Sequence, residues 1–106
     1  MERDGERKRN WTLLPFRELE TVVKVFEYGA EKYGEEGWRF VSNWRWVYVN
    51  AMLRHLFAWR NGEVYDADSK LPHLSHAIAN ALILLSRERD EIEAEEEKSE
   101  SKLDPF

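Results

Sequence analysis

The side chains that could carry out chemistry are concentrated in one stretch of the sequence, from His55 to Asn80. This stretch holds all three histidines of the chain, His55, His73 and His76, together with two aspartates and the carboxamide of Asn80. Imidazoles and carboxylates are the groups that bind divalent metal ions or transfer protons near neutral pH. The stretch therefore indicates an enzyme site that is built between helices.

The three histidines fall on different kinds of helix surface. At about 100° per residue, His73, His76 and Asn80 lie within about 60° of each other on one helix. Histidines three residues apart can both reach one ion, so this polar strip is interpreted either as a metal- or ligand-binding surface or as solvated helix surface. His55 falls within the apolar stripe of the preceding helix, where its ring must be satisfied by a ligand or by a hydrogen bond.

Acidic residues accompany the histidines in two places. Glu27 and Glu31 are one helical turn apart, so their carboxylates could share a Mg²⁺ or Mn²⁺, or else belong to an ordinary solvated face. Asp66 and Asp68 lie in the loop that directly precedes His73. They are interpreted as metal ligands beside the histidines; alternatively, Asp68 or Ser69 is only the N-cap of the next helix.

Positive and aromatic side chains that could bind a nucleotide are spread along the chain. Lys32, Arg39, Arg54 and Lys70 are candidates to offset phosphate charge, and Trp38 is a candidate to stack on a base. None of these side chains is specific by itself, because exposed lysines and arginines occur on most proteins.

Three helices are expected to position these residues, over residues 15–33, 43–60 and 72–89 or beyond. Pro15 is tolerated at the first helical position, and Gly34 ends the first helix. Apolar residues recur at helical spacing, and the strict two-residue alternation of strands is absent, so the fold class is expected to be all-α.

Apolar residues occupy nearly the whole circumference of the third predicted helix. A helix of this kind is surrounded by other helices, and three helices of this length cannot surround one another. We therefore expect the bundle to be completed by self-association, in a homodimer or a homotetramer.

Length, charge and composition set the remaining limits. The 106 residues predict a single helical domain over residues 11–90, with a flexible charged N-terminus at 1–10 and a charged tail at 91–106. The formal net charge of -5 argues against binding to a nucleic-acid polymer. The chain has no cysteine and no apolar run near the ~20 residues that span a bilayer, so a cytoplasmic protein without a membrane partner is expected.

Several short motifs follow one another in a recognisable order. They are W-x-LLP at 11–15, GAEKYG at 29–34, Trp-Arg at 38–39, A-x-x-RH at 51–55, D-x-D-S at 66–69 and LPHLSHAIAN at 71–80. Together they resemble the phage-borne MazG-like dATP/dGTP diphosphohydrolases, over roughly residues 11–85.

This resemblance implies an all-α nucleotide pyrophosphohydrolase that uses Mg²⁺ or Mn²⁺ to convert a deoxynucleoside triphosphate to a monophosphate and pyrophosphate. It also assigns roles to the candidate residues, as follows. Metal ligands would be Glu27, Glu31, Asp66, Asp68 and His76; catalytic groups would be Glu27, Glu31, His55 and His73; substrate contacts would be Lys32, Trp38, Arg39, Arg54 and Asn80.

The sequence departs from the family pattern at its acidic positions. MazG-type enzymes carry E-E-x-x-E on one helix and E-x-x-D on the next, whereas this chain has His55, His73, His76 and Asn80 where acids are expected. The family loop is also expected to have glycine where this chain has Lys70.

Two other hypotheses fit an all-α chain with histidines and aspartates. An HD-type phosphohydrolase needs a His-Asp dipeptide, and the sequence contains none. A non-catalytic helical module that binds a nucleotide or a protein is the alternative function, and the missing acidic quartet favours it.

Overall fold

The computed structural model describes residues 8–103, with side chains as far as 99. Its elements, in chain order, are η2 (Trp11–Leu13), α1 (Phe16–Tyr33), η3 (Gly37–Phe40), α2 (Trp44–Arg60) and α3 (His73–Leu103). Between residues 8 and 103 there is no strand, and the one isolated β-bridge pairs Tyr65 with Pro72. The predicted all-α class is confirmed. No helix in this part of the chain is both long enough and apolar enough to cross a membrane.

The helix ends follow local chemistry. Pro15 precedes α1, and Gly34 ends it with a positive φ of 84° while its N–H donates to the carbonyl of Ala30. Asn43 precedes α2 as predicted, but it has a left-handed φ of 57° and its side chain makes no capping hydrogen bond. Asn61 ends α2 and donates its backbone N–H to the carbonyls of Phe57 and Trp59.

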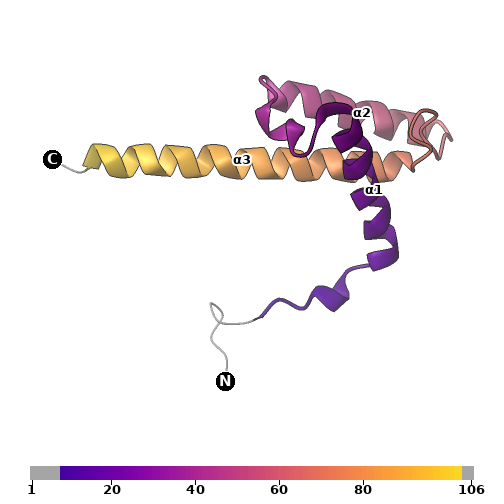
Figure 1. The fold of residues 1–106 in the computed structure, drawn as a ribbon, viewed down its shortest axis with the longest axis horizontal. Helices are drawn as coiled ribbons and strands as arrows, with labels where there is room; N and C mark the ends of the chain where they lie inside the picture. The colour runs from indigo at the N-terminus through magenta and orange to yellow at the C-terminus, as the bar shows by residue number, and fades with distance from the viewer. Residues whose placement is uncertain (1–7, 104–106) are drawn as a thin grey trace.

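The first half of α3 is packed and the second half projects from the body. Figure 1 shows α2 antiparallel along the first half of α3, with α1 crossing beside them and the N-terminal segment leading away. The helix α3 continues to Leu103, so it includes most of the charged tail predicted at residues 91–106. Of the predicted flexible N-terminus, residues 1–7 lie outside the described part of the chain.

The interior of the bundle is small and partly polar. Among the described residues, the buried apolar side chains are Val22, Ala77, Ala79 and Ile83, and no large side chain is fully buried. The buried polar ones are His73, Ser75, His76 and Asn80. The polar strip of α3 therefore faces inward, against the interpretation that it is solvated helix surface.

The larger apolar residues of α3 face outward instead. Leu74, Ile78, Leu82 and Leu85, hereafter the leucine stripe, are each between 40% and 54% exposed. The small side chains of Ala77 and Ala79 let α1 and α2 approach α3 on the other face. The predicted opposition of polar strip and leucine stripe is confirmed.

The small core predicts a marked loss of stability on truncation of one buried residue. Ile83 is 8% exposed, and replacing a buried isoleucine with alanine costs about 2–5 kcal/mol of unfolding free energy. We expect Ile83→Ala to lie at the lower end of that range in urea unfolding followed by helical circular dichroism. Val64→Ala, at an exposed loop position, is the control and should stay within about 0.5 kcal/mol of wild type. Equal losses in both variants would contradict this packing.

Candidate functional site

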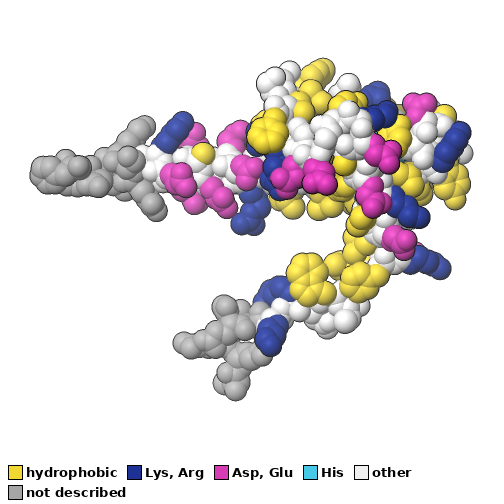
Figure 2. Space-filling model, in the orientation of Figure 1, with side chains coloured by type: hydrophobic (Ala, Val, Ile, Leu, Met, Phe, Trp, Pro, Cys, Tyr) yellow, Lys and Arg dark blue, Asp and Glu magenta, His cyan; other side chains and the backbone are white. Residues whose placement is uncertain are grey.

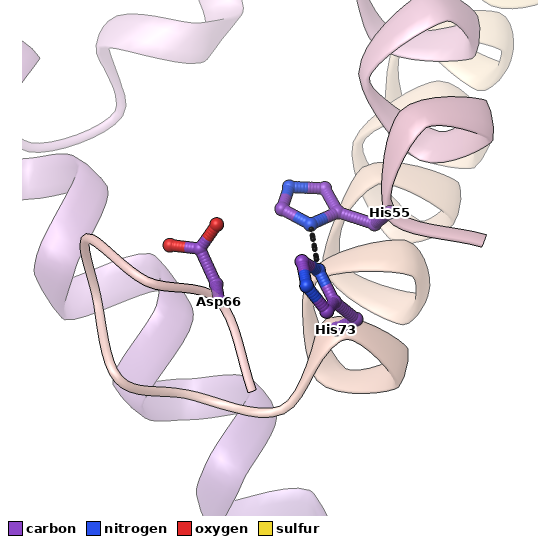
Figure 3. Close-up of side chains that lie close together, drawn as sticks. All are labelled: His55, Asp66 and His73. Carbon is purple, nitrogen blue, oxygen red and sulfur yellow. Dashed lines mark hydrogen bonds between the residues drawn. The ribbon is translucent and has the colours of Figure 1, made fainter. Parts of the chain in front are cut away.

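A cluster of three histidines and one aspartate forms where the end of α2, the start of α3 and the loop between them meet. His55 comes from α2, His73 and His76 from the first turn of α3, and Asp66 from the loop. The Nδ1 atoms of His55 and His73 are 2.8 Å apart. Figure 3 shows the carboxylate of Asp66 beside these two rings.

The loop over residues 61–72 is held by its own backbone. The N–H of Asp66 donates to the carbonyl of Leu71 at 2.8 Å, and the N–H of Lys70 donates back to the carbonyl of Asp66 at 2.9 Å. Lys70 has a left-handed φ of 64°, the conformation that glycine adopts without steric cost. This explains why glycine is expected there, and the closed loop holds Asp66 beside the first turn of α3.

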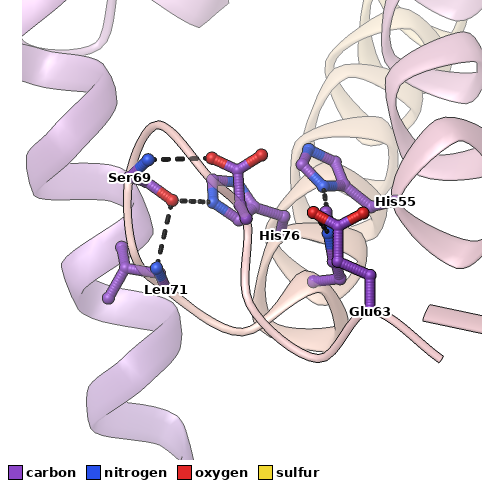
Figure 4. A network of polar contacts seen from close by, with 7 residues as sticks. His55, Glu63, Ser69, Leu71 and His76 are labelled. Carbon is purple, nitrogen blue, oxygen red and sulfur yellow. Dashed lines mark hydrogen bonds and ion pairs between the residues drawn. The ribbon is translucent and has the colours of Figure 1, made fainter. Parts of the chain in front are cut away.

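Ser69 connects the aspartate to the third histidine. Its backbone N–H donates to Asp66 Oδ2 at 2.8 Å, and its hydroxyl is 2.7 Å from His76 Nε2 (Figure 4). The same hydroxyl oxygen accepts the N–H of Leu71 at 3.2 Å. One serine therefore fixes the carboxylate, the imidazole and the loop together.

His76 is enclosed by aromatic rings and an amide. Its ring stacks on His55, with centroids 4.3 Å apart and planes 7° from parallel. The ring of Tyr28 on α1 contacts the His76 ring edge-on, with centroids 6.3 Å apart. Asn80 donates its side-chain N–H to the carbonyl of His76 at 2.8 Å. The amide of Asn80, a predicted substrate contact, thus also stabilises the helix backbone beneath the cluster.

Burial sets the charges of the cluster. Burial, followed by the neighbouring His76, lowers the pKa of His55 to about 4, and burial also lowers the pKa of His76. Burial alone would raise the pKa of Asp66, but the hydrogen bonds from the backbone and hydroxyl of Ser69 outweigh it and the pKa is lowered. Near neutral pH the cluster therefore offers two neutral imidazoles and a carboxylate, the protonation states that bind metal.

Three of these residues have the spacing of a metal site. One ligand atom each from His55, Asp66 and His73 lie within 4.8 Å of one another. The other ring nitrogen of His73, Nε2, is buried without a hydrogen bond and is 3.4 Å from Glu63 Oε1. The carboxylate of Glu63 is therefore the group nearest to this nitrogen that could accept a hydrogen bond from it.

The predicted metal ligands are only partly brought together. Asp66 belongs to the three-residue group, while Glu27, Glu31 and Asp68 are exposed and outside it. His76 is also outside that group, although its ring lies directly against His55. The metal-binding roles of these four residues stay predictions.

The predicted phosphate and base contacts lie around the cluster at different distances. Lys32 lies 4.6 Å over the ring of Tyr28, which in turn contacts His76. Arg54 is exposed on α2 next to His55. Arg39 stacks on Trp38 at 4.3 Å in η3. These roles also stay predictions.

Sequence reasoning missed two residues of the site. Ser69 lay within the D-x-D-S motif but was interpreted only as a possible helix cap, since its contact with His76 spans a loop whose path the sequence does not show. Glu63 follows the Asn61-Gly62 helix stop and carries no recognisable spacing to a histidine. Its proximity to His73 depends on the loop turning back toward α3.

A comparison with known families identifies the chain. Residues 1–97 match the sequence model of the family described as "dATP/dGTP diphosphohydrolase, N-terminal". The protein belongs to this family. Neither a curated protein nor a solved structure matches the chain. The family resemblance drawn from the short motifs is thereby confirmed.

Membership in the dATP/dGTP diphosphohydrolase family gives the cluster a chemical context. The family is named for hydrolysis of purine deoxynucleoside triphosphates, and its description refers to an N-terminal region. The motifs that carried the resemblance include the loop and the first turn of α3, which hold Asp66, Ser69, His73 and His76.

The contacts of Ser69 predict a measurable structural role. Ser69→Ala removes the hydroxyl partner of His76 Nε2 and of the Leu71 N–H, so we expect the unfolding free energy to fall by about 1–3 kcal/mol. Urea unfolding of the purified protein measures this change. Ser42→Ala, at an exposed position in the turn before α2, is the matched control. Indistinguishable stabilities of the two variants would show that Ser69 does not hold the cluster.

Proposed function

We propose that the protein is a divalent-metal-dependent diphosphohydrolase that converts dATP or dGTP to the monophosphate and pyrophosphate. The observation that carries the proposal is the partly buried group of His55, Asp66 and His73, which lie on segments that resemble the family. Neutral imidazole nitrogens and a carboxylate are suited to holding a metal ion beside a triphosphate.

The donor set fits a metal ion and indicates which residues would hold it. His55, Asp66 and His73 would be the ligands, because their donor atoms converge and the Nδ1 atoms of the two histidines face each other. A divalent cation there would offset the negative charge of the phosphates. Glu27 and Glu31 lie on either side of Tyr28 in the sequence of α1 and are proposed to bind the Mg²⁺ or Mn²⁺ that accompanies the nucleotide.

The remaining residues would bind and orient the triphosphate. Lys32 lies near enough to His76, and Arg54 to His55, to act on them electrostatically, and both would offset phosphate charge. His76 is fixed by Ser69 and by stacking on His55, so its ring is positioned to orient the attacked phosphate. The stacked Trp38 and Arg39 pair would hold the purine.

The aspartate pair of the loop supports a sharp activity test. Asp66→Asn keeps the size of the side chain but removes the charge within the cluster, so we expect kcat for dATP or dGTP to fall at least about 100-fold. Asp68→Asn, at an exposed position two residues away, should change kcat only a few-fold. Metal-dependent release of pyrophosphate and monophosphate is measured by chromatography. Full activity of Asp66→Asn would contradict the assignment, and release of intact triphosphate from the nucleoside would contradict the reaction.

A non-catalytic nucleotide-binding module is the second candidate function. The exposure of Glu27 and Glu31 favours this second function, because these two glutamates of α1 do not join the histidine cluster in the way that the acidic helix residues of MazG-type enzymes form a metal site. One experiment distinguishes the binding module from the diphosphohydrolase. A binding module would be stabilised by dATP or dGTP in thermal unfolding and would leave the nucleotide intact.

We also propose that the working unit is a homodimer joined through the leucine stripe. The four residues of the leucine stripe leave a continuous apolar surface uncovered along one face of α3. Trp11, Leu13 and Phe16 are also exposed. Figure 2 shows further yellow side chains on the segment that leads away from the helical body.

A second copy is the occupant that fits this surface best. The leucine stripe follows a single long helix, so two copies can pack the same stripe against each other about a two-fold axis. The continuation of the helix beyond the body carries Ile92, which is 50% exposed, and extends the same seam.

Light scattering after size-exclusion chromatography tests the dimer. We expect a particle of twice the chain mass of 12.7 kDa, and we expect Leu82→Glu to shift it to the monomer because two carboxylates would be buried at the axis. Arg60→Glu, at the exposed end of α2, should remain dimeric. A monomeric wild-type protein would contradict the proposal, and a tetramer would place a second interface elsewhere.

A further inference from the structure

We infer that His55, Asp66 and His73 form a two-histidine, one-carboxylate centre selective for a transition-metal ion over Mg²⁺, with Glu63 as the residue that positions His73. The inference deepens the proposed function by naming the class of ion. It concerns metal binding, which can be measured without turnover.

The spacing of the two imidazoles supports a shared ion. The Nδ1 atoms of His55 and His73 are 2.8 Å apart and face each other. Two nitrogens that each lie about 2.1 Å from one ion, at about 90° to each other, are about 3.0 Å apart. The rings therefore need only a small adjustment to place both lone pairs on one ion.

The chemistry of the three donors decides the class of ion. Mg²⁺ is a hard cation that takes nearly all its ligands from oxygen, whereas this group offers one carboxylate and two imidazoles. Imidazole nitrogens suit Zn²⁺, Ni²⁺, Co²⁺ or Fe²⁺, and two histidines with one carboxylate leave coordination positions open for substrate. The exposed acids on α1 lie outside the group, so they do not change this donor count.

Glu63 supplies the partner that a metal-bound histidine needs on its other nitrogen. Its Oε1 is 3.4 Å from His73 Nε2, on the side of the ring away from His55. Figure 4 shows Glu63 near His55, on the opposite side of the cluster from Ser69. A carboxylate in this place holds the proton on Nε2, leaves the Nδ1 lone pair for the metal and orients the ring. Glu63 is thus a positioning residue that acts through His73.

The arrangement is built from three separate segments. His55 is on α2, Asp66 and Glu63 are in the loop, and His73 opens α3. His73 is 5% exposed, and its backbone N–H is bonded to the carbonyl of Val64 at 2.8 Å. The site is therefore held by tertiary structure and is expected to exist before metal binds.

Calorimetric titration of the metal-stripped full-length chain tests the inference. We expect one Co²⁺ or Zn²⁺ per chain, bound at least about 100-fold more tightly than Mg²⁺. Bound Co²⁺ should also show visible absorption bands that shift when His73 is replaced by alanine. Mg²⁺ binding as tight as Co²⁺ binding, or a Co²⁺ spectrum unchanged in His73→Ala, would overturn the inference.

Two size-conserving variants separate metal binding from folding. Glu63→Gln should weaken Co²⁺ binding by about 10–100-fold while leaving one site per chain, and Asp66→Asn should weaken it further. Glu35→Gln, at an exposed loop glutamate, is the control and should bind as wild type. Wild-type affinity in Glu63→Gln would overturn the role of Glu63, with folding checked by circular dichroism.

Co²⁺ binding without nucleotide turnover would support this inference and contradict the proposed function. Mg²⁺-dependent turnover without Co²⁺ binding would support the proposed function and contradict this inference.

Discussion

The burial of polar side chains on the inner face of α3 is the constraint on which the rest of the structure depends. Burying an imidazole, a hydroxyl or an amide is unfavourable unless each polar atom finds a partner. Ser75 therefore bonds to Thr21 of α1 at 2.6 Å, Asn80 bonds to the backbone of its own helix, and His73 and His76 are met by His55 and Ser69. These bonds fix how α1, α2 and the loop sit against α3.

The same constraint explains the unusual distribution of apolar surface. Because the inner face of α3 is occupied by polar and small residues, the leucine stripe remains on the outside. A single chain with four buried apolar side chains among its described residues has little hydrophobic stabilisation of its own. Packing of two leucine stripes in a dimer would supply the apolar burial that one chain lacks, and would leave the polar interior of each chain to the site.

The dATP/dGTP diphosphohydrolase family context and the histidine cluster lead to one chemical interpretation. A triphosphate needs positive charge near its phosphates, while the chain as a whole has a net charge of -5. A metal ion held by neutral imidazoles and a single carboxylate leaves net positive charge at the site, which an all-carboxylate site would neutralise. In the proposed function, histidine and asparagine in place of the acids expected of MazG-type enzymes would shift the preferred ion away from Mg²⁺.

The sequence by itself determined the helices and the identity of the reactive side chains. Pro15, Gly34 and the helical spacing of apolar residues depend on short-range backbone preferences, which local sequence shows directly. The ordered set of short motifs from Trp11 to Asn80 was likewise enough to indicate the family. The opposition of the polar strip and the leucine stripe on the third helix also followed from helical periodicity alone.

Only the tertiary structure decided which face of α3 is buried and which acids join the histidines. Periodicity gives the angle between two faces but not which of them meets a neighbour, because that depends on the packing of all three helices. The choice of Asp66 over Asp68, and the part played by Glu63 and Ser69, depend on a loop closed by backbone hydrogen bonds and a left-handed Lys70. Such contacts join residues whose spacing along the chain carries no periodic signal.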